Sequence, residues 1–332
     1  MSQRIEMASG PIVAAEHMRC MEVYGGSQLT ERAVTFGGLN SWLFSRPYGE
    51  AREGGDVYYA SSCINGRISR FLLADIAGHG EAAAETAEGL KALMRRYVNW
   101  LDHGEFVRRL NRRFAEVAPE GIFATAIVAT FFAPTRRLCL CNAGHPPPLL
   151  FRAASREWSL LGADKSLTPR NIPLGILELQ DYRHFDVELE TGDCLIVYTD
   201  ALMEACGQDR QILGEDGLLE IARGLKASAP KEMAESLLQA IAGRYPAALA
   251  CDDVTVMVLQ ANGGGLHFSL TEKWGAAKTY FWALFRALRT GAEKPLFPRP
   301  DRHLANLGGA IIPVLSKLWR ARDYGSSPTW RR

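Results

Sequence analysis

Residues 72–84 read LLADIAGHGEAAA, and this stretch decides the fold. An apolar run ends at Asp75, a glycine-flanked histidine follows at 78–80, and an alanine-rich segment begins directly afterwards. Over 81–100 the apolar residues recur at helical spacing. The stretch therefore predicts a buried strand over 68–76, a turn, and a helix over 81–100, with a carboxylate at the end of the strand.

Strand patterns come in blocks on both sides of this stretch. Besides 68–76, β-branched and aromatic runs predict strands over 19–23, 41–44, 57–61, 125–132, 137–142, 149–152, 182–189, 194–199 and 254–260. Further helices are predicted over 105–117, 215–225 and 231–244. Because the helices lie between blocks of strands and do not alternate with single strands, the pattern favours an α+β antiparallel sandwich over a doubly wound parallel sheet.

Composition and charge divide the chain into a body and a tail. The 332 residues are 47% hydrophobic and 23% charged, which is ordinary for a globular protein and excludes a disordered or fibrous chain. Residues 263–332 hold 12 Lys/Arg against 4 Asp/Glu, whereas 1–262 hold 26 against 33. An acidic body with a basic tail indicates two roles. We expect an irregular segment over 1–18, a main domain over 19–262 and a tail over 263–332.

From the sequence we expect a cytoplasmic protein. The first twenty residues lack the continuous apolar region of a signal peptide, and no uncharged apolar run approaches the roughly 18–20 residues that span a bilayer. Seven cysteines is an odd number without the spacing of a disulfide framework. Cys139 and Cys141 alternate on one predicted strand, and we interpret them as small buried residues because no second Cys/His pair stands at ligand spacing.

Aspartates stand at the ends of otherwise apolar strands. Asp56 opens one strand, Asp75 and Asp200 each end one, and Asp252-Asp253 opens the last. Any one of them alone would more often cap a turn than bind a metal. Several carboxylates at one edge of a core need a cation, and an all-oxygen shell suits Mg²⁺ or Mn²⁺ better than Zn²⁺.

The motifs are specific when they are taken in order. Gly54-Gly55-Asp56 alone suggests a diguanylate cyclase, but Val57-Tyr58 stands where Glu-Phe should follow, which excludes that reading. The ordered blocks are GGDVYY at 54–59, LLADIAGHGEAAA at 72–84, CNAGHPPPLLF at 141–151, PLGI at 173–176, ETGDCLIVYTDALMEA at 190–205, LGEDGL at 213–218 and DDVTVMVL at 252–259. This series resembles the SpoIIE-like branch of the PPM serine/threonine phosphatases across 19–260.

The resemblance implies a fold and a metal site. The fold is α+β, a four-layer α-β-β-α sandwich of two antiparallel sheets flanked by helices, here followed by a helical tail. Two ions, Mn²⁺ or Mg²⁺, are implied at one edge of the sandwich. Asp56 and Asp75 match the pair that binds both metals, with Asp75 bridging, and the further implied ligands are the backbone carbonyl of Ile76, Asp200 and Asp252.

The resemblance also implies an activity. A metal-activated water would hydrolyse phosphoserine or phosphothreonine on a signalling protein such as an anti-anti-sigma-type regulator. Such a mechanism needs no protein nucleophile, and no Cys-x5-Arg loop is present. We interpret His79 and His145 as residues that orient their neighbours by hydrogen bonds, not as general acids. Asp253 is interpreted as a supporting or turn-forming residue beside Asp252.

Two positions depart from the family pattern. Ala201 replaces the glycine of the usual YTDG block, which would introduce strain if the position needs a positive φ. Tyr59 stands where the block after GGD usually has an acidic residue. The alternative function is therefore a catalytically weak or inactive module that binds and regulates a signalling partner. Because all four aspartates are retained, we favour the enzyme.

The tail predicts amphipathic helices over 266–322. Phe281, Leu284, Phe285 and Leu288 follow the i, i+3, i+4, i+7 pattern, and a second apolar stripe over 304–318 is interrupted by Pro313. Docking onto the acidic body or formation of a homodimer is favoured over peripheral membrane contact, which basic amphipathic helices can also make. No motif indicates nucleic-acid binding.

Overall fold

The computed structural model describes residues 16–18, 23–63, 66–78, 81–98, 100, 102–162, 171–205, 212–225, 229–245, 249 and 251–264. Residues 1–15 of the irregular segment expected over 1–18, His79 and the tail helices expected over 266–322 lie outside the described residues. The predictions that concern them stay predictions. Within that irregular segment, Glu16 and His17 instead form a short strand, because they pair with a longer strand later in the chain.

Two sheets form the centre of the molecule. In spatial order, the strands of the first sheet are β1 (Glu16–His17), β3 (Thr30–Phe36), β4 (Leu39–Arg46), β13 (Val254–Ala261), β12 (Cys194–Tyr198), β9 (Leu149–Arg152) and β10 (Glu157–Leu160). Those of the second are β11 (Phe185–Glu188), β8 (Arg137–Ala143), β7 (Ala124–Phe132), β6 (Ile68–Ile76), β5 (Glu53–Cys63) and β2 (Val23–Gln28). Pairing is antiparallel throughout, except that the short β1 runs parallel to β3.

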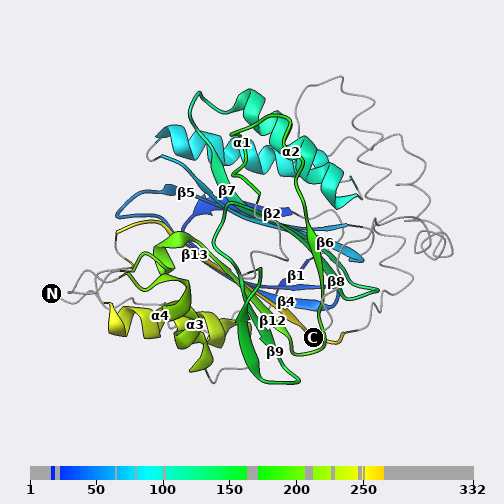
Figure 1. Ribbon diagram of the computed structural model, residues 1–332, viewed down its shortest axis with the longest axis vertical. Coiled ribbons are helices and arrows are strands. Elements are labelled where there is room, and N and C mark those ends of the chain that lie inside the picture. Colours follow the sequence, from blue (N-terminus) through cyan, green and yellow to red (C-terminus); the bar gives the residue numbers. More distant parts are fainter. Residues whose placement is uncertain are drawn as a thin grey trace.

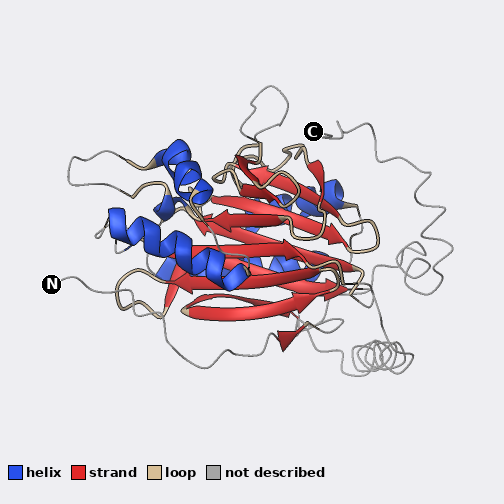
Figure 2. Cartoon of the chain, turned by 90° about the horizontal axis from the view of Figure 1, so that it is seen from below, coloured by secondary structure: helices blue, strands red, loops and turns tan. Residues whose placement is uncertain are grey.

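Helices cover the outer face of each sheet. α1 (Glu81–Tyr97) and α2 (His103–Val117) pack on the second sheet, and α3 (Gly214–Arg223) and α4 (Pro230–Arg244) pack on the first (Figure 1). The strands stack between these helices (Figure 2). Asp102 caps α2 by accepting a hydrogen bond from the backbone nitrogen of Glu105, and Pro230 occupies the first turn of α4, where its missing N–H costs nothing.

Three apolar layers hold the four layers together. Alternate residues of each strand point to opposite faces, so one set meets between the sheets and the other meets the helices. The inner layer includes Phe36, Tyr58 and Phe71, all almost completely buried. Burial of such side chains, at about 1.5–3 kcal/mol each, is the main stabilising contribution. The predicted four-layer α+β sandwich is confirmed.

Local differences from the predicted elements have physical reasons. The strand β3 was not predicted, because its polar residues lie half-buried on a sheet margin and break the apolar pattern. β10 was missed for the same reason. α1 ends at Tyr97, before the predicted end at residue 100, and the carbonyl of Val98 just beyond it accepts a hydrogen bond from the buried guanidinium of Arg70. No helix in the described part of the chain is both long and apolar enough to cross a membrane.

Candidate active site

Two aspartates face each other across neighbouring strands at one end of the sandwich. Asp56 of β5 is the direct cross-strand partner of Asp75 in β6. Both share a strand face with residues of the inner core, such as Tyr58, so their side chains lie between the two sheets. Asp56 is only 3% exposed. Like charges directly opposite each other destabilise a sheet. A positive charge between the sheets would therefore stabilise this pair.

Burial and neighbouring carboxylates raise the pKa values of the pair. Burial is the largest cause that raises the pKa of Asp56, and the charge of Asp75 adds to it. Burial raises the pKa of Asp75 to about 7, with further contributions from Asp200 and Asp252. Carboxylates that raise one another's pKa in this way would be stabilised in their charged form by a bound cation.

The other two predicted ligands approach from the first sheet. Asp200 begins a 3-10 turn directly after β12, and Asp252 lies just before β13, the neighbour of β12. Burial raises the pKa of Asp200, followed by the charges of Glu204 and Asp252. The structure thus brings the predicted aspartates into one another's electrostatic field. Among the described residues, however, no three His, Cys, Asp or Glu side chains are close enough together to form a ligand set.

Gly55 lies beside the backbone carbonyl of Ile76 and carries no side chain. A Cβ atom on Gly55 would lie 3.2 Å from the Ile76 oxygen, which is tighter than ordinary contact, so a side chain there would crowd that carbonyl. The Ile76 carbonyl and the aspartate carboxylates offer oxygen ligands, the type that Mg²⁺ and Mn²⁺ prefer. The residues present therefore fit a hard divalent cation.

Asp253 ties the first sheet to the start of β5. Its carboxylate accepts hydrogen bonds from the backbone nitrogens of Tyr48 (2.6 Å), Gly55 (2.6 Å) and Asp56 (3.3 Å). These contacts hold the backbone that carries Asp56. They are the kind of contacts that the interpretation of Asp253 as a supporting residue predicts.

Two threonines complete a polar link between the sheets that the motif search missed. The hydroxyl of Thr199 donates to Oδ2 of Asp56 (2.9 Å) and accepts from the backbone nitrogen of Thr255 (3.0 Å). Thr255 in turn contacts the hydroxyl of Ser45 (2.9 Å). Thr199 directly precedes Asp200, and Thr255 is the threonine of DDVT. Their place inside the two aspartate motifs was the signal that could have found them.

His145 forms a second link between the sheets. Its Nε2 lies 3.0 Å from the backbone carbonyl of Tyr198, which can only accept, so Nε2 carries the proton. Burial lowers the pKa of His145 to about 3, so the ring is neutral and Nδ1 accepts from the hydroxyl of Thr125 (2.9 Å). Thr125 is the cross-strand partner of Asp75. With both nitrogens engaged, His145 orients its neighbours, as predicted.

Neither departure from the family pattern disturbs the aspartates. Among the described residues the only non-glycine positions with positive φ are Arg136 and Arg156, so Ala201 carries no such strain. Tyr59 is fully buried among the residues under α1 and α2, on the face of β5 opposite to Asp56. The aromatic ring fills the outer core and leaves the space between the sheets unchanged.

Cys139 and Cys141 are free and buried, and burial raises the pKa of both thiols. The interpretation of these two residues as small buried side chains is confirmed.

Two antiparallel sheets flanked by helix pairs, with aspartates gathered at one end, define the PPM class of metal-dependent phosphatase folds. Within that class, the chain belongs to the stage II sporulation protein E (SpoIIE) family, whose sequence model matches residues 66–262.

Individual relatives agree with this assignment. The chain is 24% identical over 224 residues to the phosphoserine phosphatase RsbU of Bacillus subtilis, covering 64% of each chain. It is similar in structure to the RsbU and RsbW domains of Rv1364c from Mycobacterium tuberculosis (TM-score 0.60, 21% identity, 78% of this chain and 71% of that one). It also resembles RsbX in complex with magnesium (TM-score 0.52, 19% identity, 70% of this chain and 99% of that one). The chain thus spans just under two thirds of the length of RsbU.

Proposed function

We propose that this protein hydrolyses phosphoserine or phosphothreonine on a signalling protein, with two divalent ions, Mn²⁺ or Mg²⁺, as cofactors. The observation that carries the proposal is the Asp56–Asp75 pair, which faces the other sheet close to the Ile76 carbonyl that Gly55 leaves uncovered. Asp56, Asp75, the carbonyl of Ile76, Asp200 and Asp252 would hold the ions. Such ions activate water as a nucleophile and neutralise the charge that develops on a phosphoryl group.

The residues of the chain supply the positioning. Asp253 holds the backbone at Gly55 and Asp56, and Thr199 orients the Asp56 carboxylate by a hydrogen bond. His145 and Thr125 connect β7 to the end of β12, next to Asp200. Because each link joins the two sheets, the links together fix how the carboxylates of one sheet lie relative to those of the other.

The relatives and the thiols support the biological setting. RsbU is a phosphoserine phosphatase, which supports a phosphorylated regulator of the anti-anti-sigma type as substrate. Cys139, Cys141, Cys194 and Cys251 are free thiols, which supports a reducing cytoplasm. The alternative, an inactive binding module, rested on Ala201 and Tyr59, and the surroundings of both residues give it no support.

The test is hydrolysis of a phosphoserine peptide by the full chain with Mn²⁺, with Mg²⁺ and with EDTA. We expect turnover with either ion and loss of turnover in EDTA that returns when the ion is added back. Asp216→Asn, an exposed aspartate of α3, serves as the control and should retain activity. Turnover that EDTA does not affect would refute the proposal, and absence of turnover with every ion would favour the inactive module.

A further inference from the structure

Asp56 is held by two residues that border strands of the first sheet. Its backbone nitrogen donates to Oδ2 of Asp253 (3.3 Å), and its own Oδ2 accepts the hydroxyl proton of Thr199 (2.9 Å). Asp56 is 3% exposed, and Thr199 is fully buried. The carboxylate of Asp56 therefore cannot turn about its last side-chain bond without breaking a buried hydrogen bond.

The direction of the hydrogen bond from Thr199 is fixed by a second partner. The backbone nitrogen of Thr255, which can only donate, donates to the hydroxyl oxygen of Thr199 (3.0 Å). The single hydroxyl proton of Thr199 then has two acceptors within reach, Oδ2 of Asp56 at 2.9 Å and the carbonyl of Thr255 at 3.5 Å. The shorter distance assigns the proton to Asp56.

The position of Thr199 is itself fixed by the first sheet. Its backbone nitrogen donates to the carbonyl of Thr255 (3.1 Å), and the hydroxyl of Thr255 lies 2.9 Å from that of Ser45 on the neighbouring strand β4. Thr255 and Ser45 are both buried. Because breaking any of these contacts would leave a buried polar group without a partner, the hydroxyl of Thr199 stays directed at Asp56.

One oxygen of Asp56 is thus engaged before any ion binds. Ca²⁺ accepts roughly 6–8 oxygen ligands in a flexible arrangement and often takes both oxygens of one carboxylate. Mg²⁺ requires near-octahedral geometry, which the narrow angle between the two oxygens of one carboxylate does not fit. An ion that uses both oxygens of Asp56 must compete with the hydrogen bond from Thr199, whereas an ion that uses one oxygen need not.

We propose that Thr199 determines the metal specificity of the site: its hydroxyl occupies Oδ2 of Asp56, so that Asp56 offers one oxygen to a cation and the site prefers Mg²⁺ and Mn²⁺ to Ca²⁺. The proposal rests on the function proposed above, in which Asp56 holds an ion. Thr199 acts through Asp56 and is therefore a positioning residue. A purely structural role would weaken the binding of all these ions alike, whereas this role changes their relative affinities.

Calorimetric titration of the metal-free full chain with Mg²⁺ and with Ca²⁺ tests the proposal. The measured quantity is the selectivity ratio, which is the Kd for Ca²⁺ divided by the Kd for Mg²⁺ at the tightest site. Thr199→Val keeps the shape of the side chain without the hydroxyl, and it should lower the ratio about tenfold, the factor that corresponds to one typical hydrogen bond. Thr199→Ser keeps the hydroxyl and should keep the ratio within about twofold of the wild type. An unchanged ratio in Thr199→Val, or an equal fall in Thr199→Ser, would overturn the proposal.

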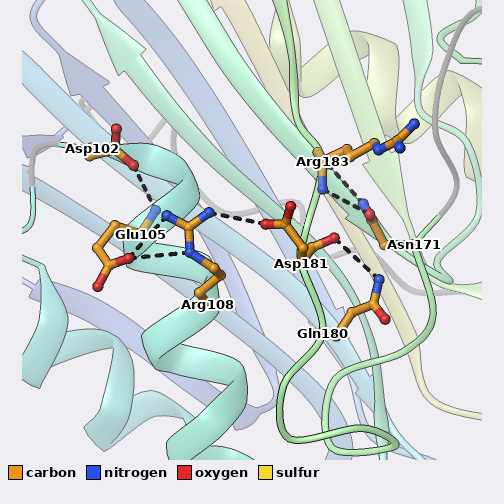
Figure 3. Close-up of polar contacts among 7 residues, drawn as sticks. All are labelled: Asp102, Glu105, Arg108, Asn171, Gln180, Asp181 and Arg183. Atoms are coloured by element: carbon orange, nitrogen blue, oxygen red, sulfur yellow. Dashed lines mark hydrogen bonds and ion pairs between the residues drawn. The ribbon is translucent and has the colours of Figure 1, made fainter. Parts of the chain in front are cut away.

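Two control variants separate this effect from general ones. Thr130→Val removes another fully buried threonine hydroxyl, which accepts from the guanidinium of Arg70 (2.8 Å) on the face of the second sheet that α2 covers. Asp181→Asn removes an exposed carboxylate, which binds Arg108 of α2 at 3.1 Å (Figure 3), and so controls for weak ion binding at the surface. Both variants should keep the selectivity ratio within about twofold. A fall in either that matches Thr199→Val would overturn the proposal.

A second substitution covers the case in which Thr199→Val does not fold. Urea unfolding establishes that each variant is folded before the titration. Thr199→Cys would replace an unfolded Thr199→Val, because a thiol is only a weak donor. Its selectivity ratio should also fall, and an unchanged ratio in this variant would overturn the proposal in the same way.

The titration separates this inference from the proposed function, because it needs no turnover. If the wild type binds the ions but does not hydrolyse a phosphoserine peptide, the proposed function fails, and the ratio in Thr199→Val still decides the role of Thr199. If hydrolysis depends on the ions and the ratio is unchanged in the variant, the function stands and the inference fails. A wild type that binds Ca²⁺ as tightly as Mg²⁺, or binds neither ion, would overturn the inference whatever its activity.

Discussion

Asp253, directly before β13, accepts a hydrogen bond from the backbone nitrogen of Gly55 in β5, and this 2.6 Å contact joins the two sheets beside the Asp56–Asp75 pair. The contact requires that no side chain stand at Gly54, because a Cβ atom there would lie 2.3 Å from Oδ2 of Asp253. The two glycines of the GGD motif thus have different structural roles. Gly54 makes room for Asp253, and Gly55 makes room beside Ile76.

Gly54→Ala should displace the Asp253 carboxylate from the backbone nitrogens that it binds. Leaving buried donors without an acceptor costs about 1–3 kcal/mol, so the free energy of unfolding should fall by that amount in urea. The Mn²⁺ concentration for half-maximal activity should rise as well, because the backbone under Asp56 loses its support. Gly89→Ala in α1, where a Cβ meets nothing within 4 Å, is the control and should be neutral or stabilising. Equal behaviour of the two variants would contradict the role of Asp253.

Asp75→Asn should abolish hydrolysis yet stabilise the metal-free protein. Since burial and neighbouring charges raise the folded pKa of Asp75 to about 7, ionisation of this group costs stability at higher pH. The folded carboxylate retains a proton that the unfolded one loses near pH 4, so the wild type loses stability as the pH rises from about 4 to 7. The free energy of unfolding of the variant should therefore rise relative to that of the wild type over this range, and the difference should be on the order of 1–4 kcal/mol at pH 8.

Thermal and urea unfolding in EDTA at pH 5 and pH 8 would measure this gain. Asp200→Asn should act in the same direction, because burial and its neighbours also raise the pKa of Asp200. The exposed Asp216→Asn is the control. Retained activity in either active-site variant would refute the ligand assignment, and a stability gain independent of pH would refute the electrostatic account.

His145 and Thr125 should be energetically coupled. His145→Ala removes the hydrogen bond to Tyr198 across the sheets and the one to Thr125 within the second sheet, and it leaves a cavity, which should cost about 2–5 kcal/mol. Thr125→Val leaves the acceptor Nδ1 of His145 without a donor and should cost about 1–3 kcal/mol. Because the residues contact each other directly, the double variant should lose less than the sum by about 0.5–3 kcal/mol. A double-mutant cycle in urea would measure the coupling, and strict additivity would argue against the link.

His103 should make the protein sensitive to acid. His103 begins α2, and its buried side chain has Nδ1 2.9 Å from the hydroxyl of Thr130 in β7. Burial, His184 and the guanidinium of Arg70 lower its pKa well below the usual value. The folded protein therefore binds fewer protons at His103 than the unfolded chain, and stability is lost as the pH falls below about 6.5.

Urea unfolding between pH 8 and pH 5 would test this dependence. Below about pH 6.5 the wild type should lose up to about 1.4 kcal/mol per pH unit more than His103→Gln. His17→Gln, at an exposed position on β1, is the control and should follow the wild type. Parallel curves for wild type and His103→Gln would show that the group does not titrate on unfolding.

Much of the architecture follows from the sequence because its signals are local. Helical periodicity predicts α2 within a few residues, and the apolar runs that end in aspartate predict β6 and β12. Antiparallel layering follows from the order of these elements. β3 escaped prediction because its half-buried, polar sequence becomes a strand only when β4 pairs with it.

The candidate site also has features that the sequence predicts and features that only the folded structure shows. The sequence by itself determined which aspartates stand at strand ends, because side-chain chemistry and strand boundaries are properties of short segments. Only the tertiary structure decided that Asp253 supports Gly55, that Thr199 reaches Asp56 and that His145 joins Thr125 to Tyr198. Each of these contacts joins residues far apart in the sequence, so it depends on the strand register and on how one sheet packs against the other. A pattern along the chain does not specify the distance between two residues that meet only in the folded protein.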